Sequence, residues 1–89
     1  MTVPALPRGV RLHWDKVRET NVLLGPERAL MLDQIAFEIL KRVDGETSEA
    51  AISADLAETF GAPLDQVSGD VAAFLADLAD KRLMEAHDG

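Results

Sequence analysis

A short stretch from Val22 to Asp33 limits what this chain can fold into. It contains the apolar run Val22 to Leu24, the break Gly25-Pro26, and a second short run from Ala29 to Leu32. Proline lacks a backbone N–H and suits the second position of a turn. Aspartate suits the residue that caps a helix. The stretch therefore predicts a strand, a tight turn, and a second strand over residues 28–32 that leads directly into a helix.

An alternating pattern just before this stretch predicts one more strand. From Val10 to Asp15 every second side chain is apolar, which places Val10, Leu12 and Trp14 on one face. Strict alternation of this kind is typical of a half-buried strand. We therefore expect all three apolar side chains, Trp14 included, to lie in the core.

The three predicted strands follow one another closely in sequence. The middle strand is expected over residues 19–24, and short antiparallel strands in this order form a meander with its first and third strands outermost. In the third strand, Leu30 and Leu32 would face one side, and Ala29 and Met31 the other. An edge strand has unpaired backbone groups that can pair with another extended chain. We expect the functional site at this third strand.

The rest of the chain has the spacing and the stop signals of three helices. Asp44-Gly45 ends the first, Thr47 or Ser48 caps the second, Gly61 ends the second, and Pro63 fits the first position of the third. The apolar positions at helical spacing are Ile35, Ala36, Ile39, Leu40 and Val43, then Ile52, Leu56 and Phe60, then Val67, Val71, Phe74, Leu75 and Leu78. The pattern predicts an α+β fold in which a three-stranded antiparallel sheet is followed by three helices that cover one of its faces.

Length indicates a single domain with short ends. The chain has 89 residues, of which 47% are hydrophobic, enough for one modest core. Residues 1–7 contain two prolines and few anchors, so we expect a mobile N-terminal tail. The domain would then span residues 8–84, with a C-terminal tail over residues 85–89.

Charge and cysteine usage exclude several classes of function. The formal net charge is −7, from 9 basic and 16 acidic residues, which disfavours nucleic acid and anionic membranes as partners. There is no cysteine, so disulfides, thiolate catalysis and cysteine-ligated zinc are excluded. The sequence has neither a secretory signal nor a run long enough to span a bilayer, and we expect a cytoplasmic protein.

The chain offers few groups for catalysis or metal binding. His13 and His87 are its only histidines, and neither has a partner at metal-ligand spacing. We expect both to be solvated, with His87 in the C-terminal tail. Phe37 falls off the apolar stripe of its helix and is either a partly exposed contact or a secondary packing residue. We therefore predict no catalytic residue, no metal site and no cofactor, so the chain is not expected to be an enzyme.

The order and spacing of several short segments resemble the PqqD family of peptide chaperones in pyrroloquinoline quinone (PQQ) biosynthesis. The resemblance runs from about Pro7 to Leu83. It is carried by Arg8-Gly9-Val10-Arg11-Leu12 with Trp14-Asp15 and Arg18, by Val22-Leu23-Leu24 with Pro26-Glu27-Arg28, by Leu32-Asp33, Ile39-Leu40 and Asp44-Gly45, and by Phe74-Leu75 with Leu78. Asp33 departs from the asparagine that is more usual there, but both residues cap helices.

This resemblance implies a winged-helix-like domain that recognises the precursor of a ribosomally synthesized and post-translationally modified peptide (RiPP). The implied precursor is PqqA, and the implied enzyme that receives it is the radical SAM protein PqqE. The leader would add as a strand beside the third strand and pack on the third helix. The implied peptide-binding residues are Arg28, Ala29, Leu30, Met31, Leu32, Val71, Phe74, Leu75, Leu78 and Lys81. Arg28 with Lys81 or Arg82 would pair with carboxylates of the peptide.

Two alternatives stay open at this point. A winged-helix nucleic-acid-binding module would share the architecture, although Asp65, Asp70, Asp77 and Asp80 along the third helix would oppose phosphate contact. An adaptor that dimerises through the same strand edge would have an identical sequence signature. The oligomeric state, expected to be a monomer or a weak homodimer, is not fixed by the sequence.

Overall fold

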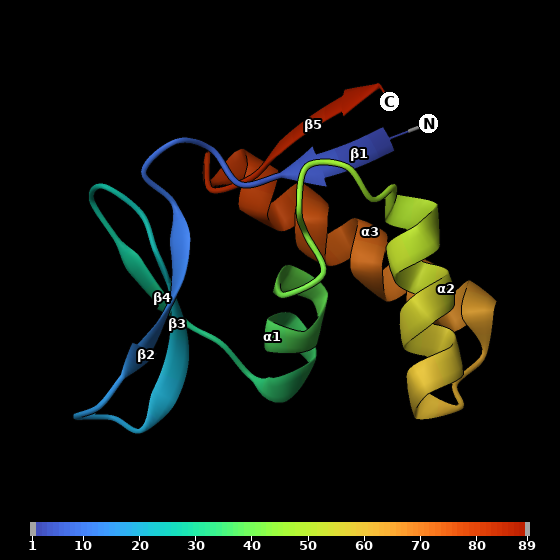
Figure 1. The fold of residues 1–89 in the computed structure, drawn as a ribbon, viewed down its shortest axis with the longest axis horizontal. Helices are drawn as coiled ribbons and strands as arrows, with labels where there is room; N and C mark the ends of the chain where they lie inside the picture. Colours follow the sequence, from blue (N-terminus) through green and yellow to red (C-terminus); the bar gives the residue numbers. More distant parts are fainter. Residues whose placement is uncertain (1, 89) are drawn as a thin grey trace.

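The three-stranded meander predicted from the sequence is present in the computed structural model, which describes residues 2–88. Strand β2 (Arg11–Asp15) pairs with β3 (Thr20–Leu24), and β3 pairs with β4 (Ala29–Met31), all antiparallel. The strand order is β2-β3-β4, so β2 and β4 are the two outer strands (Figure 1).

Three helices follow the sheet, and each begins within one residue of its predicted start. Helix α1 (Gln34–Leu40) is capped by Asp33, whose side chain accepts a 2.8 Å hydrogen bond from the N–H of Ala36. Helix α2 (Glu49–Phe60) is capped by Ser48 and ends at Gly61, which has a left-handed φ of 62°. Helix α3 (Leu64–Asp80) starts one residue later than predicted, because Pro63 is extended and stands just before it.

The two ends of the chain correct a prediction. Strands β1 (Thr2–Ala5) and β5 (Glu85–Asp88) pair antiparallel, with Val3 opposite His87, where we expected two tails. Val3 is buried, and Leu83 and Met84 belong to the core directly before β5, so both segments are held against the domain. His87 also lies within the fold, with its Nε2 3.2 Å from the carbonyl oxygen of Gly45. The outermost residues of the predicted tails, Met1 and Gly89, lie outside the described residues.

The core lies between the sheet and the helices, and it includes most of the predicted apolar positions. Its central residue in the sheet is Leu23, which is 0% exposed, and Leu12 and Leu30 pack on either side of it. The expectation that Trp14 is a core residue is wrong, because its side chain is 50% exposed. Its neighbour on the same face of the sheet is the polar Asn21, at the end of the hairpin away from the core.

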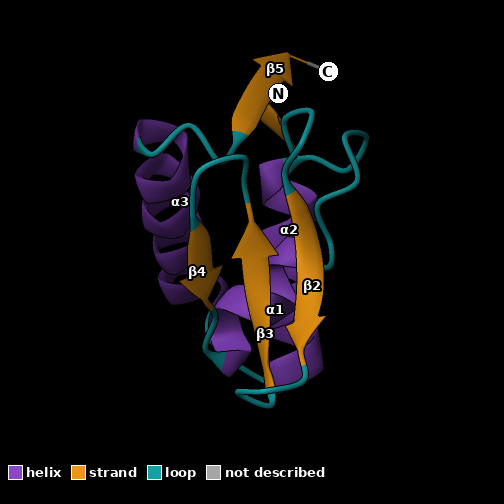
Figure 2. Cartoon of the chain, turned by 90° about the vertical axis from the view of Figure 1, so that its left-hand side faces the viewer, coloured by secondary structure: helices purple, strands orange, loops and turns teal. Residues whose placement is uncertain are grey.

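The architecture is thus α+β with three helices and antiparallel sheets, as predicted, but with the additional two-stranded sheet at the termini. Figure 2 shows the three-stranded sheet in front of the helices, with one face uncovered by any helix. Among residues 2–88, no helix combines the length and apolar character needed to cross a membrane.

Candidate functional site

Strand β4 has one open edge, and the register identifies which residues face it. The N–H of Leu32 donates to Asn21 and that of Gly25 to Arg28, each at the position where the β3–β4 ladder continues. Backbone groups alternate in direction along an antiparallel strand. Leu30 therefore bonds inward to β3, whereas the N–H and C=O groups of Ala29 and Met31 point outward. Their side chains are exposed too, with Met31 68% exposed.

The C-terminal end of helix α3 lies on the open side of β4. In Figure 2, α3 stands on the side of β4 away from β3, and Figure 1 shows that the helix slopes away from the sheet toward its N-terminus. A β-carbon added at Gly25 would lie only 2.7 Å from Cδ2 of Leu83, so the turn before β4 packs closely against the segment after α3. At the other end of β4, Ile35 faces Val67 and Val71 of the N-terminal half of α3 across a pocket. The segments just before and just after β4 therefore each lie close to an end of α3.

Basic side chains gather at the start of β4. Arg28, Lys81 and Arg82 line a pocket of about 260 Å³ together with Pro26, Glu27 and Leu83. Lys81 is held by an ion pair of 2.6 Å with Asp77, one turn earlier on α3. Arg28, Lys81 and Arg82, which are expected to pair with carboxylates of a peptide, thus line one pocket in a chain that is acidic overall.

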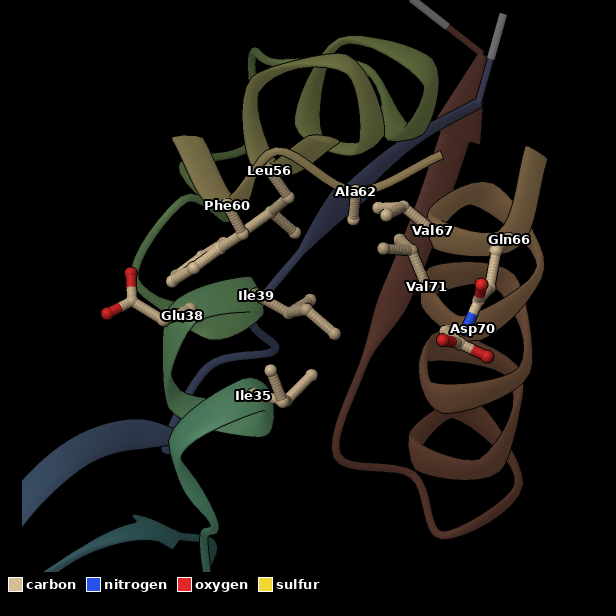
Figure 3. A pocket seen from close by; sticks show the side chains of 10 residues that line it. All are labelled: Ile35, Glu38, Ile39, Leu56, Phe60, Ala62, Gln66, Val67, Asp70 and Val71. Atoms are coloured by element: carbon tan, nitrogen blue, oxygen red, sulfur yellow. The ribbon is translucent and has the colours of Figure 1, made fainter. Parts of the chain in front are cut away.

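A mainly apolar pocket of about 220 Å³ opens beyond the end of β4 (Figure 3). It lies where α1, the end of α2 and the first half of α3 meet, and its rim includes the half-exposed side chains of Ile35 and Phe60. Glu38, Gln66 and Asp70 add polar atoms. Sequence reasoning missed this pocket, since Ile35 and Phe60 were both assigned to buried helical stripes.

An ion-pair network holds the wall of this pocket. Arg42 donates from Nη1 to Glu38 at 2.8 Å and from Nε to Asp55 of α2 at 2.6 Å. The hydrogen bond from Arg42, and then that from Lys41, holds the pKa of Glu38 below its usual value. The same two carboxylates raise the pKa of Arg42. Glu38 is therefore an anion at neutral pH, and its carboxylate already forms ion pairs with Lys41 and Arg42.

Most of the α3 residues that the resemblance implies as peptide contacts are buried in the structure. Val71, Leu75 and Leu78 are core residues at 1%, 5% and 1% exposure, so their side chains hold the fold together. Only Phe74 is half-buried, at the border of the core. Most of this apolar stripe therefore points into the core.

The described part of the chain brings no three His, Cys, Asp or Glu side chains into a group that could hold a metal ion. An open strand edge, an apolar pocket and a basic rim are instead features of a small binding domain.

Comparison with known proteins identifies this class further. Residues 20–84 match the family model described as "Coenzyme PQQ synthesis protein D (PqqD)". The chain belongs to the PqqD family. It is 46% identical over 84 residues to the PqqA binding protein of Rhizobium meliloti (strain 1021), an alignment that covers 94% of this chain and 86% of that protein. Relatives with this name have a binding role and not a catalytic one.

Two further comparisons involve a fused relative. The bifunctional coenzyme PQQ synthesis protein C/D of Methylorubrum extorquens is 46% identical over 83 residues, which are 93% of this chain but 22% of that protein. The solution NMR structure of the PqqD truncation of Methylobacterium extorquens PqqCD superposes with a TM-score of 0.80 and 46% identity, over 93% of this chain and 88% of that one. That truncation is described as a functional and stand-alone RiPP recognition element.

Proposed function

We propose that this chain binds the precursor peptide PqqA by strand addition at the open edge of β4 and presents it to the radical SAM enzyme PqqE. The observation that carries the proposal is the outward direction of the backbone groups of Ala29 and Met31 beside α3. The name of the relatives, PqqA binding protein, supports the choice of peptide. In this function the chain is a chaperone without a cofactor of its own, located in the cytoplasm and built on a winged-helix-like scaffold.

In strand addition, the backbone and the side chains contribute differently to peptide binding. Hydrogen bonds to Ala29 and Met31 provide affinity that does not depend on the peptide's sequence, and the flanking pockets select particular side chains. The apolar pocket around Ile35 and Phe60 suits an apolar side chain of the leader. At the other end of β4, Arg28 and Arg82 suit a carboxylate and would fix the register of the peptide.

The nucleic-acid alternative is weaker on charge. Asp65, Asp70, Asp77 and Asp80 are all exposed on α3, the helix that would have to approach phosphates. They are compatible with a peptide whose carboxylate lies at the basic pocket around Arg28 and Arg82.

Titration of PqqA into the ¹⁵N-labelled chain tests the proposal. The amides of Ala29 and Met31 and of the α3 residues beside them should shift, because they border the bound strand. Shifts confined to β2 or to α2 would overturn the assignment.

A proline variant tests the backbone contribution alone. Met31→Pro removes an outward N–H without touching the β3–β4 ladder, and should weaken peptide binding about tenfold. Met31→Ala is the matched control, because it shortens the same side chain and keeps the N–H. Equal affinities for these two variants would contradict strand addition at β4.

A further inference from the structure

The turn that ends helix α3 holds an arginine in a backbone conformation that favours glycine. Arg82 has a φ of 61°, in the left-handed region. Its N–H donates to the carbonyl of Ala79 at 3.0 Å, and the N–H of Leu83 donates to that of Leu78 at 2.9 Å, which is the pattern of a Schellman motif. Such a motif requires a left-handed residue just after the helix, and α2 ends on one with Gly61. At position 82 the chain therefore keeps a side chain against the preference of its backbone.

The side chain of Arg82 does not hold the fold together. It is exposed, and within residues 2–88 it forms neither an ion pair nor a side-chain hydrogen bond. The dipole of α3 favours a cation at this end, but Lys81 already supplies one and is held by Asp77 at 2.6 Å. A strained residue whose side chain has no partner inside the fold indicates a role in binding.

The turn before β4 brings a second arginine to the same place. The N–H of Gly25 donates to the carbonyl of Arg28 at 2.8 Å, which closes that turn. A β-carbon added at Gly25 would lie 2.7 Å from Cδ2 of Leu83 and 4.0 Å from Cγ of Arg28, so both side chains lie over this glycine. Arg28 and Arg82 consequently line one pocket, although they are far apart in the sequence.

The charge of this pocket is positive in a chain whose net charge is −7. Arg28, Lys81 and Arg82 line it against one acidic residue, Glu27. With Lys81 paired to Asp77, the cations of the pocket that have no ion pair within residues 2–88 are the two arginines. A guanidinium presents a planar fork of donors that fits a carboxylate, which makes arginine a stronger carboxylate ligand than lysine.

We propose that Arg82 is a specificity-determining residue of the peptide site, which binds a carboxylate of the peptide together with Arg28. The strain at Arg82 is then the stability that the chain gives up to place a guanidinium beside the start of β4. The inference rests on the proposed function, since PqqA is the ligand. The carboxylate can belong to an acidic side chain of the peptide or to its C-terminus, and modified peptides distinguish these two sources.

Replacing the arginine by glycine should change stability and binding in opposite directions. Arg82→Gly relieves the backbone strain and should raise the midpoint of thermal unfolding by a few degrees. It also removes the guanidinium and should weaken PqqA binding about tenfold. Arg82→Asn tolerates the same backbone conformation and should weaken binding equally, which separates the loss of charge from the flexibility of glycine. A lower unfolding midpoint for Arg82→Gly, or wild-type affinity for PqqA, would overturn the proposal.

A matched substitution on the opposite side of the sheet controls for net charge. Arg11→Asn on β2 removes the same charge from another exposed arginine and should leave PqqA affinity within about twofold of the wild type. If Arg11→Asn weakens binding as much as Arg82→Asn, the effect is one of overall charge and the proposal fails.

Peptides with single carboxylates removed identify the group that Arg82 binds. Each acidic side chain of PqqA is changed in turn to its amide, and the C-terminus is amidated in a separate peptide. One of these peptides should bind the wild type about tenfold more weakly and lose no further affinity with Arg82→Asn, as expected for two groups that contact each other. If every peptide loses as much affinity with Arg82→Asn as unmodified PqqA does, no carboxylate is bound by Arg82.

The Met31 variants keep this inference apart from strand addition. If Met31→Pro binds PqqA more weakly than Met31→Ala while Arg82→Gly binds normally, strand addition is supported and the inference about Arg82 fails. If Arg82→Gly weakens binding while the two Met31 variants bind alike, the carboxylate site is supported and strand addition fails.

Discussion

The two outer strands of the sheet differ in what surrounds them rather than in what they expose. Both β2 and β4 have backbone groups without a partner strand in the described residues. Of the two, only β4 has the end of a helix on its open side, a basic pocket at one end and an apolar pocket at the other. An open ladder can accept a strand of any sequence, and in the proposed function the two pockets make the β4 edge selective for a peptide.

The largest effect is expected from proline substitutions, which should be harmful where the backbone N–H points into the sheet and harmless where it points outward. Because β3 bonds to β4 through Asn21 and its alternate neighbours, it bonds to β2 through Val22, which lies opposite His13. At the inward positions His13 and Leu30, proline removes a ladder hydrogen bond and leaves a carbonyl of β3 without its donor, which should destabilise the fold by about 2–3 kcal/mol. His13 isolates the backbone effect, because its side chain is exposed. The midpoint of thermal unfolding should fall by more than about 10 °C for His13→Pro.

The outward positions supply the control for this prediction. Trp14→Pro and Met31→Pro should unfold within a few degrees of the wild type, since neither N–H has a partner in the chain. Circular dichroism melts of the four variants suffice. If the His13 and Trp14 variants melt together, the alternation inferred for β2 is wrong.

The sequence predicts those features of the fold that depend on interactions between neighbouring residues. The turn at Gly25-Pro26, the cap at Asp33 and the stop at Gly61 depend on neighbouring residues, and all three are present. The pairing of β1 with β5 joins opposite ends of the chain and leaves no local pattern, since Pro4 and the fully exposed β5 do not read as strands.

The functional site was only partly predictable, because one of its pockets also depends on contacts between segments that are far apart in the sequence. The open edge at Ala29 and Met31 follows from strand order, which the meander fixes. The pocket around Ile35 and Phe60 depends on how three helices meet, and periodicity cannot show that side chains on an apolar stripe stay half-exposed. Leu75 and Leu78 show the reverse case, because the resemblance implies that they contact the peptide and the structure buries them in the core.

A smaller effect is expected from the aspartate that follows β4. Asp33 caps α1, so Asp33→Ala should cost about 1 kcal/mol and lower the unfolding midpoint by about 4–8 °C. Fraying of the first turn of α1 would also move Ile35, and PqqA binding should weaken with it. Asp33→Asn keeps an oxygen that can accept the same bond and should restore both properties. An asparagine variant as unstable as the alanine variant would show that the cap is not the cause.

The smallest effect concerns the aspartate that ends β2. Asp15 accepts hydrogen bonds from the N–H groups of Arg18 and Val17, and the bond from Arg18 is the main cause that lowers its pKa below the usual 3.8. A carboxyl whose pKa is lower in the folded state stabilises the fold above its unfolded pKa, and this stabilisation is lost as pH falls through the folded value. The wild type should therefore melt slightly higher than Asp15→Asn at neutral pH, and the difference should shrink as the pH falls below 3.8 and vanish once the pH is below the pKa of the folded state. Melts of both proteins across this range check the prediction, and a difference that does not change with pH would assign the effect of Asp15 to packing of the turn instead of charge.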